Sequence, residues 1–230
     1  YSNGAAYYYD NKIVIWATPL NFELRGSHRW LQNVITHEYA HIVSLQKSMK
    51  MGNRIPGAYI QYMGYEEEKR KDVLYGFPNS LVSYPIPGTV VPPWLAEGIA
   101  QYMYDNADWD LWDTHRDMIL RDRAINDNLL SFNEMNTFGK KGIGNESTYN
   151  SGFALSRYIA YKYGSGIIKD LMTELSNPLQ FSINDAFNNV IDIDGEQVYD
   201  EFIATLKLRY KKLTKPIEIN HIKPNIIIDN

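Results

Sequence analysis

The sequence predicts an α+β fold that is predominantly helical, with a small sheet near the N-terminus. A short run rich in β-branched residues, NKIVIWATP, lies near the start of the chain and is typical of a strand. Most of the later sequence instead repeats apolar residues at the spacing of a helix. The chain has 230 residues, of which 44% are hydrophobic and 22% are charged, as in a globular domain with a buried core.

The first two expected elements are a strand and a long helix. We expect a strand of about six residues within 12–18, because the β-branched run ends where Pro19 interrupts it. Gly26 and Ser27 can cap a helix. From Trp30, apolar residues then recur at helical spacing until Gly52 closes the segment. This segment is the clearest helix in the sequence.

The middle of the chain is expected to contain two helices separated by a long loop. The first helix would cover 58–74. The segment GFPNSLVSYPIPGTVVPP follows it and contains five prolines, which predicts a long loop with at most a short extended piece. Pro93 suits the first turn of a helix that continues through Met103.

The rest of the chain is expected to be helical until an extended tail. Ser131 with Glu134, and Ser182 with Asp185, resemble capping boxes at helix starts. We therefore expect one domain over 1–214, followed at 215–230 by an extended linker or the start of another domain. The further helices that the apolar spacing predicts are 109–124, 149–163, 167–175, 183–190 and 197–213.

Composition excludes several classes of function. A net charge of −4 with mixed signs gives no footprint for binding nucleic acid. There is no cysteine for a disulfide or a thiolate, and no apolar run reaches the roughly 18 to 20 residues that a membrane-spanning helix needs. The chain opens on Tyr1 without a signal-like block, so we expect a mature or excised segment, with an extracytoplasmic location (periplasmic, cell-surface or secreted).

The long helix from Trp30 carries the pattern H-E-x-x-H, formed by His37, Glu38 and His41. Four residues advance a helix by about 400°, so the two imidazoles point the same way, about 40° apart and one turn along. Both can reach one metal ion, while Glu38 lies beside the ion, where it can act on water. The flanking residues are apolar, and burying histidines and a carboxylate there would be costly unless they coordinate.

A catalytic zinc ion needs a third protein ligand and one open position. One class of zinc peptidase takes that ligand from a histidine six residues after the second, but this position is Lys47. The helix PPWLAEGIAQYM offers Glu97 instead, and an acid on an otherwise apolar helix is expensive unless it is paired or coordinating. Small neighbours at 96, 98 and 100 would let this helix approach the histidine helix. We therefore predict a zinc site formed by His37, His41 and Glu97.

H-E-Y-A-H followed by W-L-A-E-G-I-A resembles the gluzincin metallopeptidases, and is most similar to peptidase-MA-like domains of the thermolysin clan. The resemblance extends upstream through NKIVIWATPLNFELRGSHRWLQNVITHE and downstream through YNSGFALSRYIAYKYG. It implies a zincin-like fold, one Zn²⁺ per chain, and Glu38 as the general base in hydrolysis of peptide or protein substrates. Such domains often precede a β-propeller, which would account for the extended tail.

The resemblance also predicts an oxyanion donor and a strand that binds the substrate. Related enzymes use a second donor to the oxyanion, which would be Tyr149 here, with His115 as the histidine alternative. In thermolysin a carboxylate one turn after the ligand glutamate orients a zinc histidine, whereas this chain has Gln101, so the partner of each histidine stays unassigned. An edge strand at 12–18 would pair with the substrate backbone. The sequence lacks the G-x-M-E-N segment of the aminopeptidases, which favours an endopeptidase.

Two other functions stay open at this point. The chain could be a catalytically weak or inactive zincin-fold scaffold within a larger assembly, although such a scaffold needs no Glu38. It could also be a zinc hydrolase that acts on a non-peptide amide or ester. The segment DIDGE at 192–196 has some of the acids of a calcium loop but lacks their full pattern, so a turn at a helix start is expected there.

Overall fold

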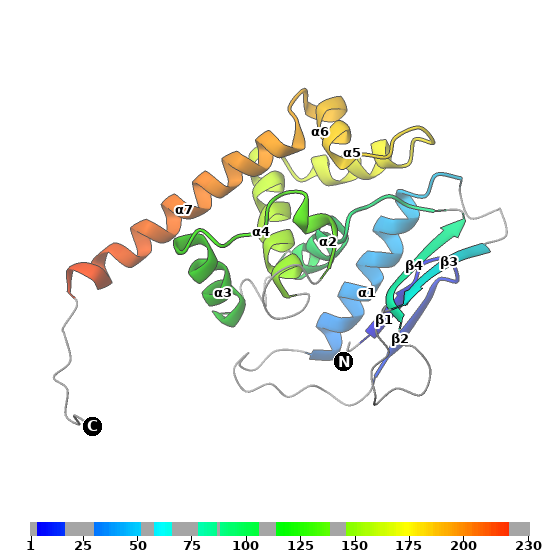
Figure 1. Ribbon diagram of the computed structural model, residues 1–230, viewed down its shortest axis with the longest axis horizontal. Coiled ribbons are helices and arrows are strands. Elements are labelled where there is room, and N and C mark those ends of the chain that lie inside the picture. The colour runs from blue at the N-terminus through cyan, green and yellow to red at the C-terminus, as the bar shows by residue number, and fades with distance from the viewer. Residues whose placement is uncertain are drawn as a thin grey trace.

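The computed structural model of the chain describes residues 4–16, 30–51, 58–65, 78–86, 88–105, 114–138 and 146–220. Within them the protein is predominantly helical with two small antiparallel sheets, which confirms the α+β prediction (Figure 1). The strands are β1 (Gly4–Tyr7), β2 (Lys12–Ile15), β3 (Ala58–Tyr65) and β4 (Pro78–Ile86). The α-helices are α1 (Trp30–Lys47), α2 (Pro93–Asp105), α3 (Thr114–Ile125), α4 (Glu146–Tyr163), α5 (Gly166–Leu175), α6 (Ile183–Ile191) and α7 (Gly195–Ile219).

The N-terminal hairpin contains one strand that was predicted and one that was not. β2 occupies the start of the predicted range 12–18 and pairs antiparallel with β1, from Gly4↔Ile15 to Tyr7↔Lys12. β1 escaped prediction because Gly4, Ala5 and Ala6 have little preference for strands. The hairpin packs along α1 (Figure 1).

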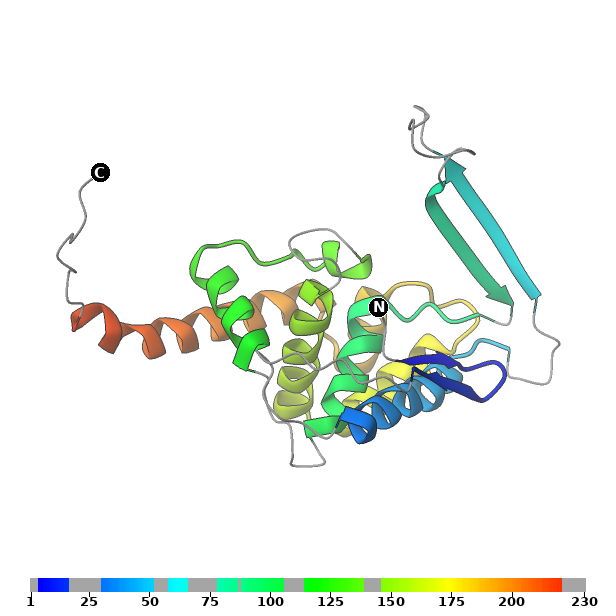
Figure 2. The ribbon, with the colours of Figure 1, turned by 90° about the horizontal axis from the view of Figure 1, so that it is seen from below.

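The prediction of a helix over 58–74 was wrong, and so was the long loop after it. Residues 58–65 form β3, whose aromatic and apolar residues suit a strand as well as a helix. β3 pairs with β4 through the proline-rich segment, and an irregularity in register lies at Gly64/Tyr65. A sheet of two strands consists of edges alone, where the missing N–H groups of Pro78 and Pro85 are tolerated. Figure 2 shows this hairpin standing away from the helices.

The remaining helices follow the prediction closely. α2, α4, α5 and α6 match their expected ranges to within three residues at each end, and the described part of 109–124 is α3. The predicted capping box at Ser131 forms: the Ser131 N–H donates to the Glu134 carboxylate at 2.8 Å, and the Glu134 N–H donates to Ser131 Oγ at 3.3 Å. At the second one Ser182 caps α6, since the Asp185 N–H donates to Ser182 Oγ at 3.3 Å. Asp194 is the N-cap of α7, so the DIDGE segment is a turn at a helix start.

The predicted extended tail does not begin at 215. α7 continues to Ile219 with Pro216 inside it, and its last turns project beyond the helical body (Figure 1). Pro216 has no N–H to donate, but the Asn220 N–H donates to the Pro216 carbonyl at 3.2 Å, so helical bonding resumes after the proline. The part of the tail at 221–230 lies outside the described residues.

The hydrophobic core lies among α2, α4, α5, α6 and α7. Its largest fully buried side chains include Trp94, Leu155, Leu171, Phe187 and Tyr210. At its centre α2 and α4 meet backbone to backbone: a Cβ on Gly98 would collide with Gly152 and with the Ser156 hydroxyl, and a Cβ on Gly152 would collide with the Trp94 carbonyl. Gly98 therefore allows α4 to approach α2 closely. From the sequence, the small residues of this helix were expected to allow the approach of α1 instead.

We expect Gly152→Ala to destabilise the protein by about 2–3 kcal/mol, because the added methyl meets a backbone carbonyl that cannot rotate away. For a chain of this size that corresponds to a melting temperature lower by roughly 4 to 12 °C. Gly166→Ala is the control, because nothing lies within 4 Å of its Cβ position. Thermal unfolding checks both variants, and equal melting temperatures for the two would contradict the close contact.

Candidate metal centre

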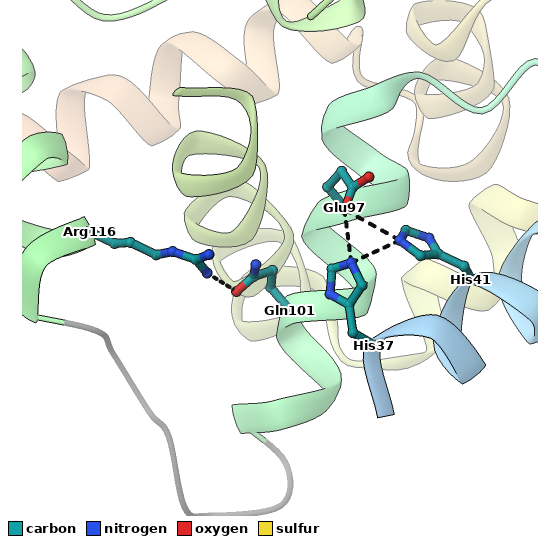
Figure 3. Close-up of polar contacts among 5 residues, drawn as sticks. All are labelled: His37, His41, Glu97, Gln101 and Arg116. Carbon is teal, nitrogen blue, oxygen red and sulfur yellow. Dashed lines mark hydrogen bonds and ion pairs between the residues drawn. The ribbon is translucent and has the colours of Figure 1, made fainter. Parts of the chain in front are cut away.

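The three predicted ligands lie together where α1 packs against α2. His37 and His41 project from α1 towards α2, and Glu97 projects from α2 between them (Figure 3). Glu97 Oε2 is 3.0 Å from Nε2 of His37 and 3.3 Å from Nε2 of His41. The two Nε2 atoms are 3.0 Å apart. All three side chains are nearly buried.

The donor set fits a divalent cation better than it fits a network of hydrogen bonds. If both imidazoles donated to Glu97 through Nε2, two N–H donors would face each other at 3.0 Å. A cation between the three atoms removes this conflict, because each atom then offers a lone pair. Ligands about 2.0–2.1 Å from a tetrahedral zinc ion lie about 3.3–3.4 Å apart, close to the separations found here.

The electrostatics favour the protonation states that metal ligands need. Burial lowers the pKa of His37, so its imidazole is neutral at neutral pH. Burial alone would raise the pKa of Glu97, but the hydrogen bonds with His37 and His41 outweigh that effect and hold the pKa at about 2. Neutral imidazole and ionised carboxylate are the forms that bind a metal ion.

The hydrogen-bond partner of Gln101 is an arginine of α3. Gln101, one turn after Glu97, accepts a hydrogen bond from the Arg116 guanidinium of α3 (Figure 3). Within the described residues, Nδ1 of His41 is buried and has no hydrogen-bond partner. Arg116 also lowers the pKa of His37 through its charge, after the larger effects of burial and neighbours. Nothing in the local sequence around Arg116 pointed to this position.

Glu38 lies next to the three ligands but outside the group itself. Its side chain is buried at the base of β1, and burial raises the pKa of its carboxyl group, while a hydrogen bond from the Ala6 backbone N–H opposes the rise. The charges of His41 and Glu97 also act on the pKa of Glu38, so its carboxyl lies within electrostatic reach of both ligands. Glu38 therefore lies beside the predicted ligands, as the helical spacing indicated.

Tyr149, the predicted oxyanion donor, lies at the same site. Its ring is nearly parallel to that of His37, at 13° with centroids 6.2 Å apart. Burial raises the pKa of the Tyr149 phenol, and the Glu97 carboxylate raises it further, so its hydroxyl keeps its proton. A protonated hydroxyl can donate a hydrogen bond to a reacting group.

The structure does not describe the side chains of the other histidines, and the expected substrate strand forms. His115 is at the start of α3, but its side chain, like His28 and His221, lies outside the described residues. The strand beside Glu38 is β1, and β2 pairs with it. β2 is an edge strand of this two-stranded sheet, so pairing of the strand at 12–18 with a substrate backbone stays a prediction.

No family model, curated protein or solved structure matches the chain. Among the described residues, His37, His41 and Glu97 are the group of three whose ligand atoms lie within 4.8 Å of one another, as a metal site requires. None of the helices in the described ranges is long and apolar enough to cross a membrane.

Proposed function

We propose that the chain is a zinc-dependent peptidase domain with a gluzincin-type site on a zincin-like fold, and that it acts as an endopeptidase. The observation that carries this proposal is the convergence of two imidazoles from α1 and a carboxylate from α2 within 3.0–3.3 Å, with Glu38 beside them. A structural zinc site would use four protein ligands, whereas three leave a position open for a reactant.

His37, His41 and Glu97 would hold a zinc ion, whose Lewis acidity would polarise a carbonyl group and make water more acidic. Glu38 then accepts the proton of the attacking water as the new C–O bond forms. It delivers this proton to the leaving amine as the C–N bond breaks, so that the carboxylate is regenerated. The Tyr149 hydroxyl donates a hydrogen bond to the oxygen on which negative charge develops.

The proposal is tested by cleavage of a mixed peptide library with the purified chain, first stripped of metal by a chelator and then reloaded with zinc. We expect internal cleavage of peptides by the reloaded chain and little by the stripped one. Mass spectrometry of the products separates endopeptidase activity from trimming at the ends. Peptides with blocked N-termini should be cleaved as well as free ones.

A chain that binds one zinc ion but cleaves no peptide would contradict the proposal. A scaffold role would then account better for the site, unless small ester or amide substrates are hydrolysed. Since Glu38 serves no purpose in a passive scaffold, its buried carboxylate favours the enzyme.

Tyr149→Phe is expected to lower kcat by roughly 10²–10³-fold at saturating zinc, the effect of losing one oxyanion donor. The hydroxyl also hydrogen-bonds Glu97, so zinc affinity should fall by about 10- to 100-fold at most. The phenyl ring keeps the packing against His37, so only the hydroxyl is lost. Steady-state kinetics on a library-derived peptide measures the effect. Tyr161→Phe is the control, because that ring is 90% exposed on the same helix. An unchanged kcat in Tyr149→Phe would remove Tyr149 from the mechanism.

A further inference from the structure

Strand β1 lies directly on the side chain of Glu38. A Cβ placed on Gly4 would be 2.9 Å from both Cγ and Oε1 of Glu38, and 3.0 Å from Cγ1 of Val34. Real Cβ atoms do not approach other atoms this closely, so any side chain at position 4 must displace a neighbour. Val34 and Glu38 are four residues apart on α1, and Gly4 covers the groove between them.

The backbone of β1 also bonds to the same carboxylate. The N–H of Ala6 donates a hydrogen bond to Glu38. Gly4 and Ala6 are two residues apart on a strand, so both present the same side of β1 to α1. The contact with Gly4 limits where the methylene groups of Glu38 can lie, and the hydrogen bond from Ala6 orients the carboxylate oxygens.

The far end of the hairpin is held on α1 by a separate contact. Gln46 Nε2 is 2.6 Å from the Tyr8 carbonyl oxygen and 2.6 Å from Asn11 Oδ1. Asn11 has a φ of 50° in the turn, a conformation that asparagine tolerates well. From Gly4 at Glu38 to Tyr8 at Gln46, β1 therefore runs along α1 in the same direction as the helix. This anchoring fixes the strand against the helix at both of its ends.

We propose that β1 holds the Glu38 carboxylate in its orientation. Gly4 is the positioning residue, because its missing side chain lets the strand backbone pack directly against Glu38. The inference rests on the proposed function for its catalytic consequence, but the contact itself does not depend on turnover. A glutamate side chain has three rotatable bonds, and an unrestrained carboxylate would occupy several orientations. β1 limits this freedom, so the proton acceptor is held ready for the attacking water.

Gly4→Ala tests the proposal in the full chain loaded with zinc. We expect kcat to fall by roughly 10- to 100-fold, because a displacement of about 1 Å in a reacting group has an effect of that order. KM should change by less than about two-fold, and zinc stoichiometry should stay at one, since His37 and His41 project towards α2 (Figure 3), whereas position 4 meets Glu38 and Val34. Gly166→Ala is the matched control and should retain native kinetics. A native kcat in Gly4→Ala, or a loss of zinc in step with activity, would overturn the proposal.

A second measurement, of thermal stability, tests the contact between Gly4 and Glu38 without any substrate. Gly4→Ala should lower the melting temperature in the native background, and most of this loss should disappear in a Glu38→Ala background, where the two closest atoms are absent and only Val34 Cγ1 stays near. An equal loss in both backgrounds would show that the methyl group does not meet Glu38, which would overturn the proposal. A chain that cleaves no peptide would remove the proposed function, while this double-mutant cycle would still decide whether Gly4 positions Glu38.

Discussion

Glu38→Gln is expected to lower kcat by roughly 10²–10⁴-fold while the chain keeps its zinc ion. The amide has nearly the size of the carboxylate, and its oxygen can still accept the Ala6 N–H, so the packing beneath β1 should survive. What is lost is the ability to accept a proton from water, because an amide is not a base at neutral pH. The effect should therefore fall on kcat and leave the metal ligands unchanged.

Steady-state kinetics together with zinc content by elemental analysis measures this result. Glu174→Gln provides the matched control, since Glu174 lies on α5 and bonds Asn189, outside the site. The control should have native kcat and one zinc ion per chain. If Glu38→Gln retained most of the native kcat, another group would be the base. If it lost zinc, Glu38 would contribute to the metal site itself.

Glu97→Ala is expected to remove zinc binding. Loss of a group that only supports a ligand weakens metal affinity by about 10- to 100-fold, so loss of a ligand should exceed that range. The variant also leaves two buried imidazoles whose Nε2 atoms are 3.0 Å apart without the carboxylate that holds them. We therefore expect stoichiometry well below one after dialysis, and no peptide cleavage.

Zinc-dependent stabilisation gives a second readout for the same variant. At a free zinc concentration about 100 times Kd, the native chain should gain about 2.7 kcal/mol, and Glu97→Ala should gain almost none. Glu174→Ala, which also removes a glutamate from a helix, should keep the native gain. Equal stabilisation of Glu97→Ala and the native chain by zinc would show that the ion binds elsewhere, and the enzyme proposal would then fail.

The sequence determined those features that depend on neighbours along one helix. Helical spacing alone places His37 and His41 on one face with Glu38 beside them, and the structure has this arrangement. The capping contacts at Ser131 and Ser182 are equally local, because their partners lie three residues away. Glu97 was identifiable because an acid on an apolar helix needs a partner.

Only the tertiary structure decided the contacts between segments that are distant in sequence. Residues 58–65 become a strand because 78–86 lies beside them, and strand preference depends strongly on such partners. The packing of β1 against Glu38 requires a glycine at position 4, and this requirement is seen only from the atoms that surround it. Gly98 likewise allows the close approach of α4. Arg116 reaches the site through the packing of α3. In each case the deciding energy comes from a contact across the fold, which a periodic pattern along the chain does not encode.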